Sequence, residues 1–281
     1  MELLCMNEDI EKKISRETEL RGFSRQTKES YIFHIRKFLD FIRKPARRAT
    51  LTDVKRYVLH LRERKQKPAT VNVALAAIKF LYVQLWNRKS FMEVRPLKNR
   101  KRAPTIMPRE AIEKMIRAVP NIKHKLFIEL LYSSGLRVGE AVSLKLKHIM
   151  PEERIMVIRN GKGGKDRYVM LSQRFICRLK VYMERRHLLG INSEYLFSSR
   201  KGHITTRTGE AIIKNAAGKA GIRYNVFPHA LRASFATHML EKGEDIGMIQ
   251  LLLGHADIKT TRIYARHSTG LIKKVQSPMD Y

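Results

Sequence analysis

The chain has 281 residues, of which 43% are hydrophobic and 30% charged, an ordinary composition for a globular protein and a length that favours two domains. Its 57 Lys and Arg residues against 26 Asp and Glu residues give a formal net charge of +31. Such a surplus favours a polyanion, DNA or RNA first, as the partner, although a generally basic protein would show it too. Because residues 1–100 carry +13 and residues 101–281 carry +18, we expect both halves to contact that partner.

Composition also argues against several classes of protein. The two cysteines, Cys5 and Cys177, lie far apart without metal-ligand spacing, so neither a disulfide framework nor a cysteine metal site is expected. The first residues contain acidic Glu8 and Asp9 rather than the apolar core of a signal peptide. No apolar run reaches the length expected of a transmembrane helix. We therefore expect a cytoplasmic protein without a membrane partner.

The first part of the chain is predicted to form four helices. The first spans roughly 8–20, and the second begins after Ser24 as its N-cap. The third follows Thr52 as its N-cap and covers 53–62. The fourth covers about 70–86 and is apolar enough to be the centre of the bundle. These helices predict a small helical domain with basic outer faces.

A basic, proline-rich stretch over residues 96–108 follows this helical domain and is too polar to be core. It predicts either a solvated linker or, as we favour, a linker that lies along a phosphate backbone. The stretch divides the chain into a first domain over 1–95 and a second over 109–281.

The second domain mixes helices with short strands. An apolar helix is predicted to end at Gly135 as its C-terminal cap, and Asn160-Gly161 is a strong signal for a hairpin turn. The fold class is therefore mainly α with a small antiparallel sheet. The predicted elements are helices over 110–119, 122–134 and 173–189 and strands over 155–159, 168–171 and 195–197, followed by helices that include 244–253.

Six side chains of this domain could together bind and transfer a phosphoryl group without a metal. Arginines neutralise the charge of a phosphodiester, imidazoles and an ammonium group move protons, and a phenol can attack phosphorus. No acidic cluster accompanies them, which disfavours a metal-dependent nuclease. The six are Arg137, Lys162, His229, Arg232, His255 and Tyr264.

Each of these residues has an ordinary interpretation when taken alone. Arg137 could be a surface arginine that pairs with Glu140. Lys162 lies in a turn, where a lysine is usually only solvated, and Lys165 competes with it. The Gly-Gly-Lys sequence there is not a P-loop, because Ser or Thr and a following helix are missing. Most tyrosines are packing residues, so Tyr264 gains its significance from its place in a pattern.

The pattern itself is specific. Gly-Leu-Arg precedes Glu140, and Gly-Lys-Gly occupies the hairpin. His229 and Arg232 follow a proline and share one face of a first helical turn. His255 comes after Leu-Gly, and Tyr264 nine residues later. In order and spacing these motifs resemble the tyrosine recombinase (phage integrase) family, and the resemblance covers nearly the whole chain.

That resemblance implies a role for each of the six residues. Arg137 and Arg232 would bind the scissile phosphate, with His255 hydrogen-bonded to it. His229 would be a general acid/base, and Lys162 would protonate the leaving 5′-oxygen. Tyr264 would be the nucleophile that forms a 3′-phosphotyrosyl bond. Ala233 stands where many relatives carry His, but that position is not catalytic in the family.

The resemblance also implies an architecture and partners. Residues 1–95 would be a core-binding (SAM-like) domain, and residues 109–281 a catalytic domain whose tail begins at about 268. The two would form a clamp on double-stranded DNA, and a homotetramer would hold two DNA sites. Length leaves no room for an additional arm-binding domain, so the chain is similar to the Xer type, which resolves chromosome dimers at a dif-like site. Neither metal, ATP nor any other cofactor would be needed.

Two other functions remain open at this point. A type IB topoisomerase uses the same chemistry, but the small helical N-terminal domain argues against it. A non-catalytic DNA-binding protein with a decayed integrase fold is the second, and the six filled catalytic positions argue against that.

Overall fold

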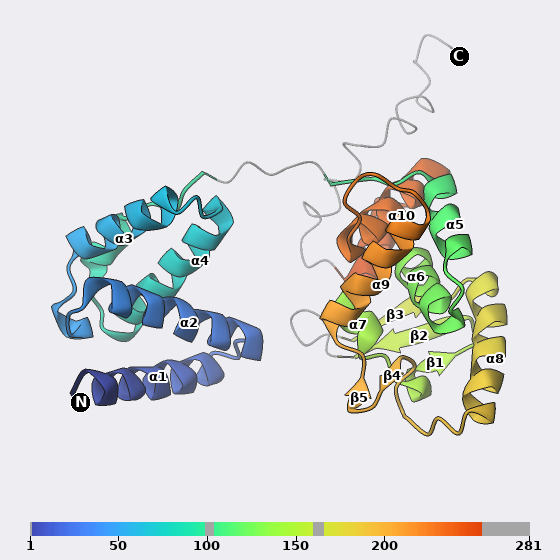
Figure 1. Ribbon diagram of the computed structural model, residues 1–281, viewed down its shortest axis with the longest axis horizontal. Coiled ribbons are helices and arrows are strands. Elements are labelled where there is room, and N and C mark those ends of the chain that lie inside the picture. The colour runs from blue at the N-terminus through green and yellow to red at the C-terminus, as the bar shows by residue number, and fades with distance from the viewer. Residues whose placement is uncertain (1, 99–103, 160–165, 255–281) are drawn as a thin grey trace, which may run out of the picture. The chain divides into compact units, whose positions relative to one another are not determined.

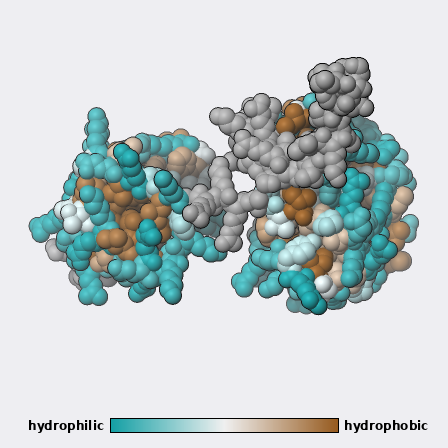
Figure 2. Space-filling model, turned by 90° about the horizontal axis from the view of Figure 1, so that it is seen from above, coloured by the Kyte–Doolittle hydropathy of each residue, from teal (hydrophilic) through white to brown (hydrophobic). Residues whose placement is uncertain are grey.

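The structure, a computed structural model, describes residues 2–98, 104–159 and 166–254 (Figure 1). The chain divides into two compact units, Met1–Arg102 and Ala103–Tyr281. Each unit has a hydrophobic core of its own. The face of each unit that Figure 2 displays is mainly hydrophilic, with smaller hydrophobic patches.

The N-terminal unit consists of helices, as predicted. Helix α4 packs against α2 and α3, and its apolar residues lie at the centre of this unit's core. Its last turns pass into a π-helical segment, where the sequence predicts an uninterrupted helix. The elements are α1 (Glu2–Leu20), α2 (Arg25–Ile42), η1 (Ala46–Arg48), α3 (Leu51–Glu63), α4 (Pro68–Lys79), η2 (Phe80–Leu85) and η3 (Lys89–Glu93).

The start of α3 differs from the prediction. The N-cap is Thr50 rather than Thr52, and its hydroxyl accepts a hydrogen bond from the backbone N–H of Asp53. The buried Asp53 carboxylate accepts the N–H of Thr50 at 2.9 Å and pairs with Lys44 at 2.9 Å. This reciprocal capping box satisfies two helix-end donors, which is why the earlier threonine is favoured.

Segment Pro68–Leu85 is long and apolar enough to cross a membrane by length and composition, whereas the sequence predicted no such run. In the structure its side chains line the N-terminal core. Tyr82 is fully buried there, donates a hydrogen bond to Ala46 O at 2.8 Å and stacks on Phe91. The segment's apolar character is therefore accounted for by packing within this unit.

The C-terminal unit is mainly helical with two small antiparallel sheets, which confirms the predicted fold class (Figure 1). Strands β1, β2 and β3 form one sheet in that order, and β4 pairs with β5. Helix α6 packs against α8 and α10, and α11 packs against β3. The elements are α5 (Arg109–Ala118), α6 (Ile122–Ser134), α7 (Val138–Val142), η4 (Leu146–His148), β1 (Ile149–Met150), β2 (Ile155–Ile158), β3 (Arg167–Met170), α8 (Gln173–Leu188), β4 (Ser198–Ser199), β5 (Gly202–His203), α9 (Thr206–Lys219), α10 (Pro228–Lys242) and α11 (Ile246–Leu253).

The predicted strand over 195–197 is wrong. Only Tyr195 makes a strand-like bridge, to Lys145, and the strand β4 begins after Phe197. Phe197 is instead fully buried, with its ring edge-on to that of Phe127. The apolar side chains that suggested a strand therefore belong to a turn packed into the core.

The C-terminal end of α6 and the N-terminal end of α10 position the backbone of the predicted site residues. Helix α6 is buried over most of its length and ends at Gly135, as predicted, with a φ of 60°. A Cβ at Gly135 would lie 2.4 Å from the Phe235 ring, so this turn packs directly on α10. Helix α10 begins with Pro228 in its first turn, which is also as predicted. The ends of α6 and α10 thus bring Arg137 and Arg232 into one region.

Candidate active site

Three of the six predicted site residues, Arg137, His229 and Arg232, belong to the described part of the structure. The other three, Lys162, His255 and Tyr264, lie outside the described residues. The structure therefore describes the part of the predicted constellation formed by Arg137, His229 and Arg232.

Arg232 lies near the start of α10, one turn into the helix, and is only 2% exposed. Its guanidinium donates to the backbone oxygen of Gly135, at the end of α6, and to that of Leu253 at 2.6 Å, at the end of α11. A buried cation requires such partners, because loss of hydration is otherwise costly. These two carbonyls fix the side chain in one orientation between three helices.

Arg137 follows the α6 cap and is the N-cap residue of α7, with 31% of its side chain exposed. Its Nη1 donates to Glu140 Oε1 at 2.8 Å, and its Nη2 donates to Gly254 O at 3.3 Å. The pairing with Glu140 that the sequence suggested is therefore present. About a third of the side chain nonetheless remains exposed, so an anion can still approach Arg137.

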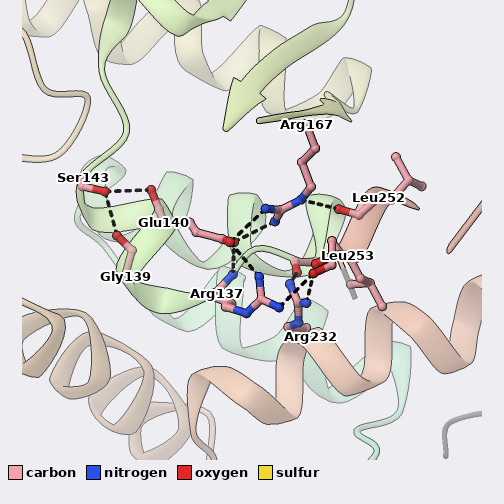
Figure 3. Close-up of polar contacts among 10 residues, drawn as sticks. Arg137, Gly139, Glu140, Ser143, Arg167, Arg232, Leu252 and Leu253 are labelled. Atoms are coloured by element: carbon pink, nitrogen blue, oxygen red, sulfur yellow. Dashed lines mark hydrogen bonds and ion pairs between the residues drawn. The ribbon is translucent and has the colours of Figure 1, made fainter. Parts of the chain in front are cut away.

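Glu140 is the acceptor at the centre of the site. Its side chain is 11% exposed and binds both Arg137 and Arg167 (Figure 3). Arg167 forms the two parallel bonds of a bidentate pair with it, at 2.9 and 2.8 Å. Burial by itself would raise the pKa of the Glu140 carboxyl, but the hydrogen bonds and charge of Arg167, followed by the hydrogen bonds from Arg137, hold that pKa below its usual value. The carboxylate is therefore ionised at neutral pH.

Three arginines from different elements bind the end of α11 (Figure 3). Arg167 Nε donates to Leu252 O at 2.9 Å, while Arg232 and Arg137 bind the next two carbonyls. The last carbonyls of a helix lack intrahelical partners and carry the negative end of its dipole. Helix α11 therefore anchors the cations, and the same helix end leads directly to position 255.

His229 lies one turn before Arg232 on α10 and is exposed at the surface. Protein atoms nonetheless surround its ring closely enough that desolvation, followed by the positive charges of Arg232 and Arg137, lowers its pKa. The neutral imidazole is therefore favoured at neutral pH in the absence of an anion. In that form the ring can accept a proton at one nitrogen and donate a hydrogen bond from the other.

The site as a whole combines three guanidinium groups with one carboxylate, which leaves a positive charge near Arg137 and Arg232. Such an arrangement stabilises an anion and any additional negative charge that develops on it. In the part of the chain that the structure describes, no group of three His, Cys, Asp or Glu side chains is placed to hold a metal ion.

Arg167 was not predicted as part of this site. It stands 27 residues after Glu140, and no local motif links the two positions. The only sequence feature that could have indicated Arg167 is a charged residue directly before a predicted strand. That feature is too common to identify a site residue. The sequence suggested only that Glu140 could pair with Arg137, and the structure shows that it contacts both Arg137 and Arg167.

Comparison with known proteins agrees with this geometry. Residues 105–270 match the sequence model of the Phage integrase family, and residues 10–90 match that of the phage integrase N-terminal SAM-like domain. The chain therefore belongs to the phage integrase family, the tyrosine recombinases, as the motifs indicated.

Individual relatives show which members of the family the chain resembles. The chain is 34% identical to tyrosine recombinase XerA of Pyrococcus horikoshii, with 94% of this chain and 91% of that protein aligned. It is 37% identical to tyrosine recombinase XerA of Pyrococcus furiosus, with 91% and 88% covered. The match extends over nearly the full length of both, so these relatives share both units of the chain.

Solved structures show the same fold. A crystal structure of XerA recombinase matches 96% of this chain and 99% of that one, at 27% identity and a TM-score of 0.56. The XerH site-specific recombinase bound to its difH substrate matches 92% and 81%, at 23% identity and a TM-score of 0.73. The arrangement of helices and small sheets is therefore that of tyrosine recombinases.

Proposed function

We propose that the protein is a site-specific DNA recombinase of the Xer type that cuts and rejoins DNA through a 3′-phosphotyrosyl intermediate. The observation that carries the proposal is the convergence of Arg137 and Arg232 on the end of α11, with His229 one helical turn away. These residue types at these positions fit the family's phosphate-binding set.

In the proposed reaction Arg137 and Arg232 bind the non-bridging oxygens of the scissile phosphate. Their hydrogen bonds strengthen as negative charge develops on phosphorus-bound oxygens in the pentavalent transition state. The guanidinium groups are already held by helix-end carbonyls, so little reorganisation accompanies the reaction. His255 would complete this set of phosphate ligands.

Proton transfer would be divided among three residues. A phenol with a pKa of about 10 is a poor nucleophile at neutral pH. Neutral His229 supports the attack of Tyr264 as the proton acceptor, directly or through the phosphate. Lys162 protonates the leaving 5′-oxygen. The phosphorus–O5′ bond breaks as the phosphorus–O(tyrosine) bond forms, so one phosphodiester replaces another and neither ATP nor a metal is required.

The partner and biological role belong to the same proposal. Positive charge in both units and in the linker over 96–108 suits a clamp on a duplex, with residues 1–95 binding the core of the site. A homotetramer on two sites would exchange two strands at a time. By analogy with XerH on difH, the site would be dif-like and the role resolution of chromosome dimers in the cytoplasm. The tail from about 268 would connect neighbouring protomers.

Nicked suicide duplexes from the dif-like region of the protein's own genome test this proposal. We expect the unmodified protein to form a covalent adduct in the presence of EDTA. Tyr264→Phe should bind the same duplex and form no adduct, because its ring lacks the nucleophilic oxygen. Tyr281→Phe, a change of the terminal tyrosine, is the matched control and should react normally. No adduct from the unmodified protein on any dif-like duplex would reject the proposal, as would an adduct from Tyr264→Phe.

A further inference from the structure

We propose that Arg167 is a positioning residue for strand cleavage, which compensates the charge of Glu140 and so leaves the charge of Arg137 available to the scissile phosphate. The inference rests on the proposed function, because it assigns a further residue to the same reaction. It comes from the contacts of Arg167 within the described site.

All three guanidinium nitrogens of Arg167 are occupied by protein acceptors. Nη1 and Nη2 bind the two oxygens of Glu140, and Nε binds Leu252 O. The side chain is only 10% exposed. A cation that is buried and bound at all three nitrogens in this way is not placed to bind DNA itself, so its effect must pass through the groups that it contacts.

Both carboxylate oxygens of Glu140 are bound as well. Its Oε1 accepts from the guanidinium of Arg137 and from that of Arg167, and its Oε2 accepts from the backbone N–H of Arg137 and again from Arg167. A carboxylate offers about four lone-pair positions, and all four are used here. Glu140 therefore fixes both the backbone and the side chain of Arg137.

Charge balance gives Arg167 its role in this arrangement. Glu140 and Arg137 alone would form a closed, neutral ion pair, in which the carboxylate competes with the phosphate for the guanidinium. With Arg167 present, the group of three carries a net positive charge while Glu140 still orients Arg137. The interior of a protein screens charges less than water does. The difference in net charge, with and without Arg167, therefore changes the attraction between Arg137 and a bound phosphate strongly.

The second contact of Arg167 fixes the turn after α11. Gly254 has a φ of 61°, and a Cβ there would lie 2.9 Å from Arg167 Cδ and 3.1 Å from its Nε. Arg167 therefore packs flat on this turn, whose Gly254 carbonyl accepts from Arg137. Arg167 begins β3, so it also joins the β2–β3 hairpin to the helix end that holds Arg137 and Arg232.

The test compares cleavage of two suicide duplexes that differ at the scissile position. One carries the native phosphate, and the other carries a methylphosphonate, in which a methyl group replaces a charged non-bridging oxygen. Arg167→Met, which keeps the length of the side chain without its charge, should slow cleavage of the native duplex by roughly 10–10²-fold, the scale expected when a reacting group is misplaced. On the uncharged methylphosphonate the same variant should fall within a few-fold of the unmodified protein, because the lost charge is no longer needed.

Charge compensation also predicts the behaviour of a double variant. Glu140→Gln added to Arg167→Met removes the carboxylate that would neutralise Arg137, so the double variant should cleave the native duplex faster than Arg167→Met alone.

The matched control for both variants is Arg178→Met, which breaks an ion pair with the buried Glu129 between α6 and α8. Its effect on cleavage should be small and equal for the two duplexes.

The outcomes are distinguishable from a failure of the proposed function. If the unmodified protein forms no adduct, the recombinase proposal fails. If it does, and Arg167→Met cleaves the native duplex as fast or is equally slow on both duplexes, the role of Arg167 is rejected. Circular dichroism and thermal melting report whether each variant folds. If Arg167→Met does not fold, Arg167→Gln, which also lacks the charge but keeps a hydrogen-bond donor for Glu140, is compared on the same duplexes, and an equal defect on both again rejects the role.

Discussion

The two units differ in what they bury. Among the described residues, the N-terminal unit buries two polar side chains, Thr18 and Asp53, both hydrogen-bonded within their own neighbourhood. Its interior is otherwise apolar and rich in aromatic rings. The C-terminal unit also has an apolar core, but it buries further polar and charged groups: Glu129, Ser134, Arg186, Arg232, Ser234, Thr237 and His238.

This difference is informative because buried charge costs free energy unless it is paired and hydrogen-bonded. A unit that only has to fold and present a surface has no need for it. A unit that stabilises a transition state needs charges held in place before the reaction. A buried charge can also have a structural purpose: Arg186 donates to the carbonyls of Ser193, Tyr195 and Leu196 and fixes a loop.

The largest expected effects test whether the two cores are independent. Phe38→Ala in the N-terminal unit and Phe127→Ala in the C-terminal unit each replace a fully buried ring. Each should cost about 3–5 kcal/mol of unfolding free energy, through lost burial and the cavity that remains. Because the cores are separate, calorimetry should show two transitions, of which each variant lowers one. A single transition that both variants lower would contradict two independent units.

Two buried arginines of the C-terminal unit, Arg232 and Arg186, allow the proposed catalytic role of the first to be compared with the structural role of the second. Arg232→Met and Arg186→Met each leave backbone carbonyls without partners, which should cost about 1–3 kcal/mol of stability. Only Arg232→Met should slow covalent adduct formation, by roughly 10²–10³-fold, the usual effect of removing one oxyanion ligand. Single-turnover rates with the suicide duplex, measured well below either melting temperature, would show this. Equal loss of activity in both variants would mean that stability alone explains the defect.

Much of the fold was predictable because its signals are local. Helix boundaries such as the Gly135 cap and Pro228 in the first turn of α10 depend on residues close in sequence. The N-cap of α3 was placed two residues late although its signal is also local, whereas the wrong strand over 195–197 depends on distant partners. Near residue 195, backbone bonds from Leu146 N to Glu194 O and from Leu196 N to Leu144 O replace the predicted strand with a bridge and a turn. No local pattern shows such pairings.

The motifs predicted Arg137, His229 and Arg232 as site residues, and the structure brings the two arginines to one helix end. Their roles in the reaction stay predictions. Arg167 was missed because its partner, Glu140, lies on another element and the charge balance between them is a tertiary property. Lys162, His255 and Tyr264 stay predictions, since they fall outside the described residues.

Two glycines that end neighbouring helices allow a smaller comparison. Gly243 and Gly254 end α10 and α11 with φ values of 97° and 61°, so alanine at either position should cost about 1–2 kcal/mol through backbone strain. A Cβ at Gly243 meets nothing, whereas one at Gly254 displaces Arg167. We expect Gly254→Ala alone to slow cleavage in the suicide-duplex assay. Normal cleavage by Gly254→Ala would show that the Arg167 contact is unimportant.

The smallest expected effect is the pH dependence of stability that His238 gives to the C-terminal unit. His238 is 8% exposed, and its Nδ1 lies 2.8 Å from the hydroxyl of Tyr132. Burial, followed by the charge of Arg109, lowers the pKa of His238, although Glu241 and Glu110 oppose the shift. Because the folded pKa lies below the unfolded value of about 6.5, the unfolded chain binds the proton more readily.

The contribution of His238 is therefore present above about pH 6.5 and is lost as the pH falls, with a slope of at most about 1.4 kcal/mol per pH unit. Between pH 7.5 and 5.5, His238→Gln should flatten the pH dependence of the C-terminal transition and leave the N-terminal transition unchanged. The paired carboxylate of Glu140, whose pKa is lowered, adds a loss only in more acidic solution, below the ordinary range of a glutamate. His34→Gln is the reciprocal variant, because burial lowers the pKa of His34 in the N-terminal unit, and it should flatten only the N-terminal transition. If either variant changed both transitions equally, the two units would share their titrating groups, and the independence on which the comparison depends would be lost.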